Sequence, residues 1–227
     1  MSGQIKTKLI GQALSRGMSR RGFIAGSAGF LAASAASAAT IATPAQTQGP
    51  FYPLFKPIDA DADLTLLKGA TAPAEGEVIE VTGRVLSLKG HALPGVVVEI
   101  WQADAKGHYN HVLDAGGRRD KNFQGFGAVR SGADGGYLFR TIRPRFYDTG
   151  FGVRAPHIHF YVNAAEAGEL TTQMYFVGDR YLESDFIFQN VPRAERYRVM
   201  VERQDPGSEF EPETGLYNFD LTVRPTT

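Results

Sequence analysis

The sequence predicts an all-β protein, an antiparallel β-sandwich with long loops and an extended N-terminal arm. From residue 77 onward the chain consists of short runs rich in Val, Ile, Thr, Tyr and Phe. Turn signals such as Leu93-Pro94-Gly95 and Asp134-Gly135-Gly136 separate these runs, as is typical of strands joined by tight turns. Helical periodicity is nearly absent, and the one plausible helical turn is residues 164–168. These three observations together predict a sandwich or a barrel.

Composition limits what the protein can be. The chain has 227 residues, of which 43% are apolar, which is enough for one domain with a sizeable core. The formal net charge is zero, which argues against nucleic acid as a main partner. There is no Cys, so disulfides, thiolate metal sites and a thiol nucleophile are excluded. Any metal must therefore be held by His, Tyr, Asp, Glu or backbone oxygen.

Residues 1–39 are predicted to be a twin-arginine signal peptide. Ser19-Arg20-Arg21-Gly22-Phe23-Ile24 has the twin-arginine pattern. A weakly apolar, Ala- and Gly-rich run follows and ends in Ala36-Ser37-Ala38, which suits signal peptidase. This run lacks the roughly 20 strongly apolar residues of a membrane helix, so no membrane span is expected in the mature protein. We therefore expect export by the twin-arginine route to the periplasm or the cell exterior.

Residues 40–76 are predicted to be an extended arm lying on the domain. They are rich in Pro and Ala, sustain no helical or strand period, and contain Gly49-Pro50-Phe51-Tyr52-Pro53. Residues 77–227 form the β-sandwich domain, with neither an internal repeat nor a second domain. We expect strands at residues 78–86, 96–102, 137–141, 157–163, 171–176, 197–202 and 217–223.

The stretch Arg154-Ala155-Pro156-His157-Ile158-His159-Phe160 is the clearest candidate for a functional site. Side chains alternate between the faces of a strand, so His157 and His159 point the same way while Ile158 and Phe160 pack behind them. Two imidazoles on one face can hold a metal ion, and Arg154 would add a positive charge. By itself the pair could equally be two histidines in a core strand.

Three kinds of metal site could contain this pair. A cupin needs a Glu shortly after the histidines, but Glu166 comes too late in the chain. A 2-His-1-carboxylate site needs a nearby acid, and the nearest upstream one, Asp148, lies in a Gly-containing loop well before His157. A site of two Tyr and two His could take its tyrosines from the loops at residues 101–111 and 143–147.

Residues 49 to about 223 resemble the intradiol ring-cleavage dioxygenases, the group of protocatechuate 3,4-dioxygenase and catechol 1,2-dioxygenase. Three blocks carry the resemblance, namely residues 100–111 around Tyr109, residues 137–147 ending at Tyr147, and residues 154–160 with the histidine pair. The arm motif Gly49-Pro50-Phe51-Tyr52 and Gln173 also match. The helical N-terminal region of the catechol 1,2-dioxygenases is missing, so the likeness is greatest to the metal-bearing protocatechuate-type subunit.

The resemblance implies a non-haem Fe(III) ion held by Tyr109, Tyr147, His157 and His159. Tyr147 and His159 would be the axial pair, with Tyr109 and His157 in the equatorial plane. Phenolate is a hard anion that stabilises Fe(III), and coordination deprotonates a phenol whose free pKa is about 10.

The resemblance also implies the activity. A small aromatic diol of the catechol type would be cleaved with O2 between its two hydroxyl-bearing carbons, giving a muconate-type dicarboxylic acid. The implied catalytic residues are Arg154, Tyr147 and Gln173. The implied substrate-binding residues are Gly49, Pro50, Tyr52 and Arg154. The extended arm is compatible with association into a homo-oligomer. The rival interpretations are an exported β-sandwich binding module and a cupin-like metalloprotein, both without ring-cleavage activity.

Overall fold

The computed structural model describes residues 41–114, 117–205 and 214–225, all of which belong to one compact unit that begins at residue 36. The predicted signal peptide, residues 1–39, lies outside the described residues, so this assignment stays a prediction. Among the described residues, no helix combines the length and the apolar composition needed to cross a bilayer.

Two five-stranded sheets and a small hairpin make up the strand structure. In the first sheet β1 pairs with β4 on one side and with β11 and β12 on the other, and β10 extends β11. Its strands are β1 (Val78–Ser87), β4 (Gly136–Ile142), β10 (Arg203–Gln204), β11 (Gly215–Asn218) and β12 (Leu221–Val223). The second sheet has the order β3 (Phe126–Arg130), β2 (Val97–Gln102), β7 (His157–Asn163), β8 (Glu169–Phe176) and β9 (Met200–Val201). The hairpin pairs β5 (Tyr147–Asp148) with β6 (Val153–Arg154).

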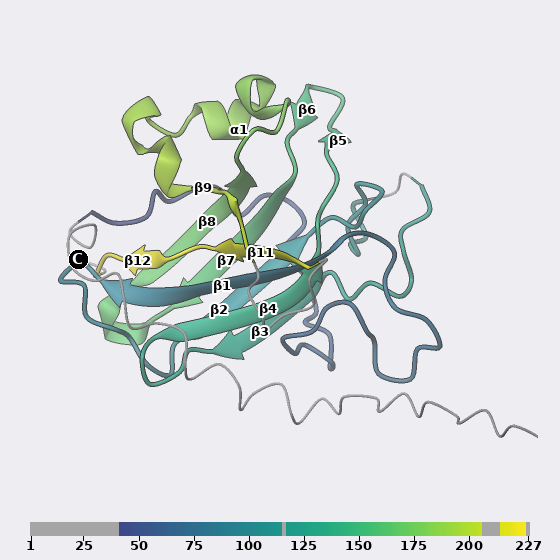
Figure 1. Ribbon diagram of the computed structural model, residues 1–227. Helices are drawn as coiled ribbons and strands as arrows, with labels where there is room; N and C mark the ends of the chain where they lie inside the picture. Colours follow the sequence, from purple (N-terminus) through teal and green to yellow (C-terminus); the bar gives the residue numbers. More distant parts are fainter. Residues whose placement is uncertain (1–40, 115–116, 206–213, 226–227) are drawn as a thin grey trace, which may run out of the picture. The chain divides into compact units, whose positions relative to one another are not determined.

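The two sheets pack face to face, which confirms the predicted all-β sandwich (Figure 1). Ile79 and Phe139 of the first sheet and Ile100 and Phe160 of the second, each fully buried, belong to one hydrophobic core. The sheets are mixed rather than purely antiparallel, because β1 runs parallel to β11 and β12, and β8 runs parallel to β9.

Strand β3 and the two-residue strands β5, β6 and β10 were not predicted, the predicted strand 217–223 is divided into β11 and β12, and one predicted strand is shorter than expected. β3 reads Phe-Gly-Ala-Val-Arg, and its glycine weakens the strand signal. A Cβ at Gly127 would lie 2.6 Å from the Leu64 side chain of the arm, so the close approach of the arm excludes a larger residue. In the predicted strand 197–202, the first two residues end a 3₁₀-helix, η3 (Arg193–Arg198), and only β9 is extended.

The structure also contains helices that the sequence did not predict. The expected turn at residues 164–168 is present as η1 (Ala165–Ala167). Beyond it lie η2 (Leu182–Ser184), α1 (Phe186–Gln189) and η3, each too short to show a helical period in the sequence. These helices and the β5–β6 hairpin lie at the same end of the sandwich (Figure 1).

The described part of the arm, residues 41–76, contains no helix or strand and only one isolated bridge, between Asp63 and Arg140. It is held by backbone hydrogen bonds to both sheets. The amide of Thr43 donates to Thr222 O at 3.0 Å, and that of Gln46 donates to Thr171 O at 2.8 Å.

Candidate metal centre

Strand β7 presents His157 and His159 on the outer face of the second sheet, as predicted. Ile158 and Phe160, between and after them, point inward to the hydrophobic core. The strand register places His159 between Trp101 on β2 and Gln173 on β8. Both histidines are nevertheless buried, because the arm and loops cover this outer face.

Three side-chain atoms converge at this point. The Nε2 atom of His157 lies 3.2 Å from Nε2 of His159 and 3.3 Å from the hydroxyl oxygen of Tyr109. The Nδ1 atom of His157 lies 2.6 Å from the carbonyl oxygen of Ala155. Because a carbonyl only accepts, Nδ1 carries the proton and Nε2 offers a lone pair, the arrangement that is usual for histidine ligands of metals.

Burial keeps both imidazoles neutral. It lowers the pKa of His157 and His159 well below the usual value, and the positive charge of Arg154 lowers both further. The ring of His159 stacks on Trp101, with centroids 4.7 Å apart and an interplanar angle of 9°. Two neutral imidazoles with facing Nε2 atoms are a suitable pair of metal ligands.

A turn in the loop after β2 brings Tyr109 to the histidines. The Tyr109 amide donates to a carboxylate oxygen of Asp114 at 2.6 Å, and the amides of Lys106 and His108 donate to Asp104. Phe51 of the arm stacks on the Tyr109 ring, with centroids 4.4 Å apart. Tyr109 is therefore only 3% exposed, and burial raises its pKa well above the ordinary value.

The β5–β6 hairpin delivers Tyr147. Its strands pair Tyr147 directly with Arg154, and its ring centroid lies 5.6 Å from that of Tyr109 and 5.8 Å from that of His157. Tyr147 remains partly exposed. Burial raises its pKa, whereas the positive charge of Arg154 lowers it.

These four residues fit a ferric ion in donor type, protonation and grouping. No group of three or more His, Asp and Glu side chains that could hold a metal occurs in the described ranges. A cupin site or a 2-His-1-carboxylate site is therefore not formed around His157 and His159 by described residues. Hard phenolate oxygens together with imidazole nitrogens suit iron, and coordination would reverse the pKa rise that burial imposes on the two phenols.

Arg154 and Gln173 lie together beside the ligands. Nη2 of Arg154 donates to Gln173 Oε1 at 2.6 Å and to the Tyr175 hydroxyl at 3.4 Å. Gln173 Nε2 in turn donates to Thr47 O of the arm at 2.9 Å. Both predicted catalytic side chains are thus buried and held in place.

The arm residues predicted to bind substrate are divided between two places. Gly49 has φ +70°, and a Cβ there would lie 3.4 Å from His159 Cε1, so the backbone passes directly over the ligand. Pro50, next to it, is exposed. Tyr52 is turned away, because its hydroxyl donates to Glu99 Oε2 at 2.6 Å and its ring meets the edge of Trp101.

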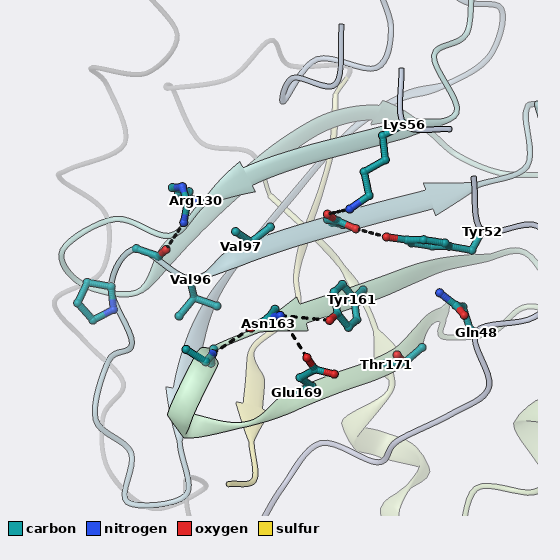
Figure 2. Close-up of a pocket in the computed structure, with 15 residues that line it drawn as sticks. Gln48, Tyr52, Lys56, Val96, Val97, Arg130, Tyr161, Asn163, Glu169 and Thr171 are labelled. Atoms are coloured by element: carbon teal, nitrogen blue, oxygen red, sulfur yellow. Dashed lines mark hydrogen bonds and ion pairs between the residues drawn. The ribbon is translucent and has the colours of Figure 1, made fainter. Parts of the chain in front are cut away.

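Beyond Tyr52 the same outer face is hollowed (Figure 2). The hollow has a volume of about 910 Å³ and contains none of the four predicted ligands. At its edge the carboxylate of Glu99 lies between the Tyr52 hydroxyl and the ammonium of Lys56, which is 2.5 Å away (Figure 2). Glu99 therefore fixes the arm at the edge of the hollow.

Sequence reasoning missed three residues that shape the site. Phe51 was noted only as part of the arm motif, and Trp101 only as part of the strand 96–102 and of the loop that follows it. Asp185, fully buried beside Arg154, was not singled out at all. For Asp185 the available signal was an acidic residue before the apolar run 186–188, which is typical of a helix N-cap.

The comparisons with known proteins all match dioxygenases. The family model described as Dioxygenase matches residues 48–225. The chain is 41% identical to the protocatechuate 3,4-dioxygenase beta chain of Burkholderia cepacia over 72% of each chain. It is 36% identical to catechol 1,2-dioxygenase 1 of Acinetobacter lwoffii, but that match spans only 48% of this chain and 39% of the relative.

Solved structures agree. The dioxygenase domain of a dioxygenase carbohydrate-binding protein fusion from Streptomyces sp. SirexAA-E is 27% identical, with a TM-score of 0.60, and the match covers 82% of this chain and 100% of that one. Catechol 1,2-dioxygenase of Acinetobacter radioresistens, at 22% identity and a TM-score of 0.66 over 83% of this chain and 64% of that one, shares the fold.

Proposed function

The chain belongs to the intradiol ring-cleavage dioxygenases, and on that premise we propose that it is a non-haem Fe(III) enzyme acting on a small catechol. With O2, it would break the ring between the two hydroxyl-bearing carbons and give a muconate-type dicarboxylic acid. One observation carries the proposal: the Nε2 atom of His157 lies 3.3 Å from the Tyr109 hydroxyl oxygen and 3.2 Å from Nε2 of His159.

Tyr109, Tyr147, His157 and His159 would hold the iron. When bound, Fe(III) withdraws electron density from a coordinated catecholate and makes its ring reactive towards O2. The two phenolates bring two negative charges to the ion, while the two imidazoles remain neutral. This balance limits the cost of placing a highly charged ion on a buried face.

The two tyrosines have different roles. Tyr109 is enclosed under Phe51 and is a permanent ligand. Tyr147 is partly exposed on a short hairpin, so it is the one that can move aside for the substrate. Because burial raises the pKa of the Tyr147 phenol, its oxygen would be a suitable acceptor for a proton of the incoming diol.

Arg154 supplies a fixed positive charge beside the reacting ring. Charge that develops on the ring during attack by O2 is stabilised by a cation already in place, in a site from which the arm excludes water. Gln173 receives an Nη2 hydrogen of Arg154 and is itself fixed by Thr47. Gly49 leaves room above His159 that any side chain would fill.

The substrate class follows from the relatives. The protein from Burkholderia cepacia is named for protocatechuate and the one from Acinetobacter lwoffii for catechol. We propose that this chain acts on a small diol of the same type. Export by the twin-arginine route, proposed on the pattern at residues 19–24, would give it extracytoplasmic substrates. Association into a homo-oligomer stays a prediction, which the mass of the purified protein in solution checks.

The test is reconstitution with ferric iron. We expect a wine-red protein, from tyrosinate-to-iron charge transfer, that consumes O2 with at least one of catechol, protocatechuate and hydroxyquinol. Tyr147→Phe should keep its iron, change colour and lose most of its turnover, while Tyr197→Phe, an exposed tyrosine, should behave as the parent. A colourless protein that takes up zinc but no iron would refute the proposal.

A further inference from the structure

Asp185 is a fully buried carboxylate next to the site. One oxygen accepts the amide hydrogens of Ile187 and Phe188, both at 2.9 Å, and so caps α1. The other accepts the amide of Ala155 at 2.7 Å. Both oxygens lie close to Nε of Arg154, at 3.1 and 3.0 Å. A buried charge needs such partners, and here they come from two distant parts of the chain.

Together with two other residues, Asp185 fixes the Arg154 guanidinium. Nε is bound by Asp185, and Nη2 is bound by Gln173 and the Tyr175 hydroxyl. The guanidinium carbon also lies 5.6 Å from the centre of the Phe186 ring. A side-chain hydrogen bond also links Arg154 to Tyr147, so the guanidinium is held beside one of the four predicted ligands.

The hairpin alone cannot fix this orientation. β6 is two residues long, and its pairing sets the Arg154 backbone opposite Tyr147 but leaves the side-chain rotamers open. An arginine side chain loses rotamer entropy when it is fixed, and other contacts must offset this loss. Asp185 binds both the backbone that follows Arg154 and the guanidinium itself, so it fixes the whole residue at once.

We propose that Asp185 is the positioning residue of this site, holding Arg154 so that its guanidinium is presented to the catechol ring during cleavage. The proposal rests on the proposed function for its effect on rate, but not for the contact itself. A displacement of about 1 Å at a catalytic group can cost about 10²-fold in rate. Loosening Arg154 should therefore slow the reaction without releasing iron, since Asp185 contacts none of the four predicted ligands.

Asp185→Asn is the sharpest change, because Asn keeps the shape and one oxygen that can cap α1, while it removes the charge and puts a donating amide nitrogen in place of the oxygen that accepts from Ala155 and Arg154. Glu80→Gln is the matched control. Glu80 is also fully buried and accepts a hydrogen bond from an arginine, Arg140 at 2.8 Å, but it lies on the first sheet, away from the ligands. Iron content, anaerobic catechol binding, kcat and KM are measured for the parent, both variants, Arg154→Lys and the double variant Arg154→Lys/Asp185→Asn.

We expect Asp185→Asn to retain iron and to lose about 10²-fold in kcat, with Glu80→Gln within about twofold of the parent. In the Arg154→Lys background, Asp185→Asn should change kcat by less than about twofold, because the residue on which it acts is already altered. Parent-like kcat in Asp185→Asn would overturn the proposal. So would an equal loss in both backgrounds, since Asp185 would then act without Arg154.

A second measurement does not depend on turnover or on a stable variant. In the iron-free parent, the Nε–H proton of Arg154 should exchange with solvent at least about tenfold more slowly than those of exposed arginines, as NMR can follow. Exchange as fast as at an exposed arginine would overturn the proposal even if Asp185→Asn fails to fold. A parent that cleaves no catechol would count against the proposed function alone, and this exchange rate would still decide whether Asp185 holds Arg154.

Discussion

The two faces of the second sheet bury their side chains by different means. The inner face, with Ile158 and Phe160 on β7, packs against the other sheet in a continuous apolar core. On the outer face, with His157 and His159 on the same strand, no second five-stranded sheet is packed in the described part of the chain. This face is covered by the arm, by the loop that carries Tyr109 and by the β5–β6 hairpin.

The inner face therefore contributes mainly to stability, and the outer face mainly positions the residues of the site. Apolar burial on the inner face is non-directional and scales with area. On the outer face, single hydrogen bonds and ring contacts place polar groups, as with His157 on Ala155 or Tyr52 on Glu99. Changes to the inner face should therefore alter the free energy of unfolding, and changes to the outer face should mainly alter the site.

Phe160→Ala should have the largest effect on stability. Phe160 is fully buried in the core, and removing a buried phenyl ring costs about 3–5 kcal/mol of the free energy of unfolding. Denaturant unfolding of the iron-free protein measures it. The folded variant should still bind ferric iron with the parent's colour, and loss of colour while folding is intact would show that the faces are not independent.

The second largest effect on stability should come from lowering the pH, and the two histidines of the outer face should cause it. Because burial and Arg154 lower the pKa of His157 and His159, the folded state binds fewer protons than the unfolded state below about pH 6.5. The iron-free protein should therefore be fully stable above that pH. As pH falls towards the lowered values, it should lose up to about 1.4 kcal/mol per pH unit for each histidine.

Unfolding at a series of pH values between 7.5 and 5 checks this prediction. The double variant His157→Gln/His159→Gln is the control, and its stability should change much less over that range. If the parent and the double variant have the same pH dependence, the two imidazoles are not neutral and buried in solution.

Glu99→Gln should have a smaller effect on stability and a local effect on the arm. Gln still accepts from Tyr52 but no longer pairs with Lys56, whose side chain is half exposed, so the loss should be about 1 kcal/mol or less. Amides of residues 49–56 should exchange faster with solvent, while those of β7 stay protected. Unchanged exchange in the arm would show that Glu99 does not hold it.

Tyr161→Phe should change least. Tyr161 lies on the outer face beside the hollow (Figure 2), and its hydroxyl accepts one hydrogen bond, from Asn163 at 3.3 Å. We expect a change within about 0.5 kcal/mol and the same iron content as the parent. A larger loss would mean that the hollow is filled in solution, and the mass of the protein in solution would then show whether a second copy fills it.

Strand alternation was enough to predict the two faces. It placed His157 and His159 together and Ile158 behind them because that pattern is local to one strand. The position of Asp185 could not be predicted in this way, since its contact with Arg154 joins segments separated by the whole of β7 and β8. Strand β3 could not be predicted for a similar reason. Its Gly127 weakens the strand pattern, and the need for glycine there comes from the Leu64 side chain of the arm, which is distant in sequence.

The arm has a consequence for the order in which the molecule is completed during synthesis. A chain leaves the ribosome from its N-terminus, so residues 41–52 emerge long before their partners. Gln46 binds Gln173, 127 positions later, and Thr43 pairs with Thr222, 179 positions later. The arm therefore lacks these hydrogen-bond partners until β8 of the second sheet and then β12 have been made. A segment that is translated before the sandwich can therefore cover the histidines only after their own strand and its neighbour β8 have been made.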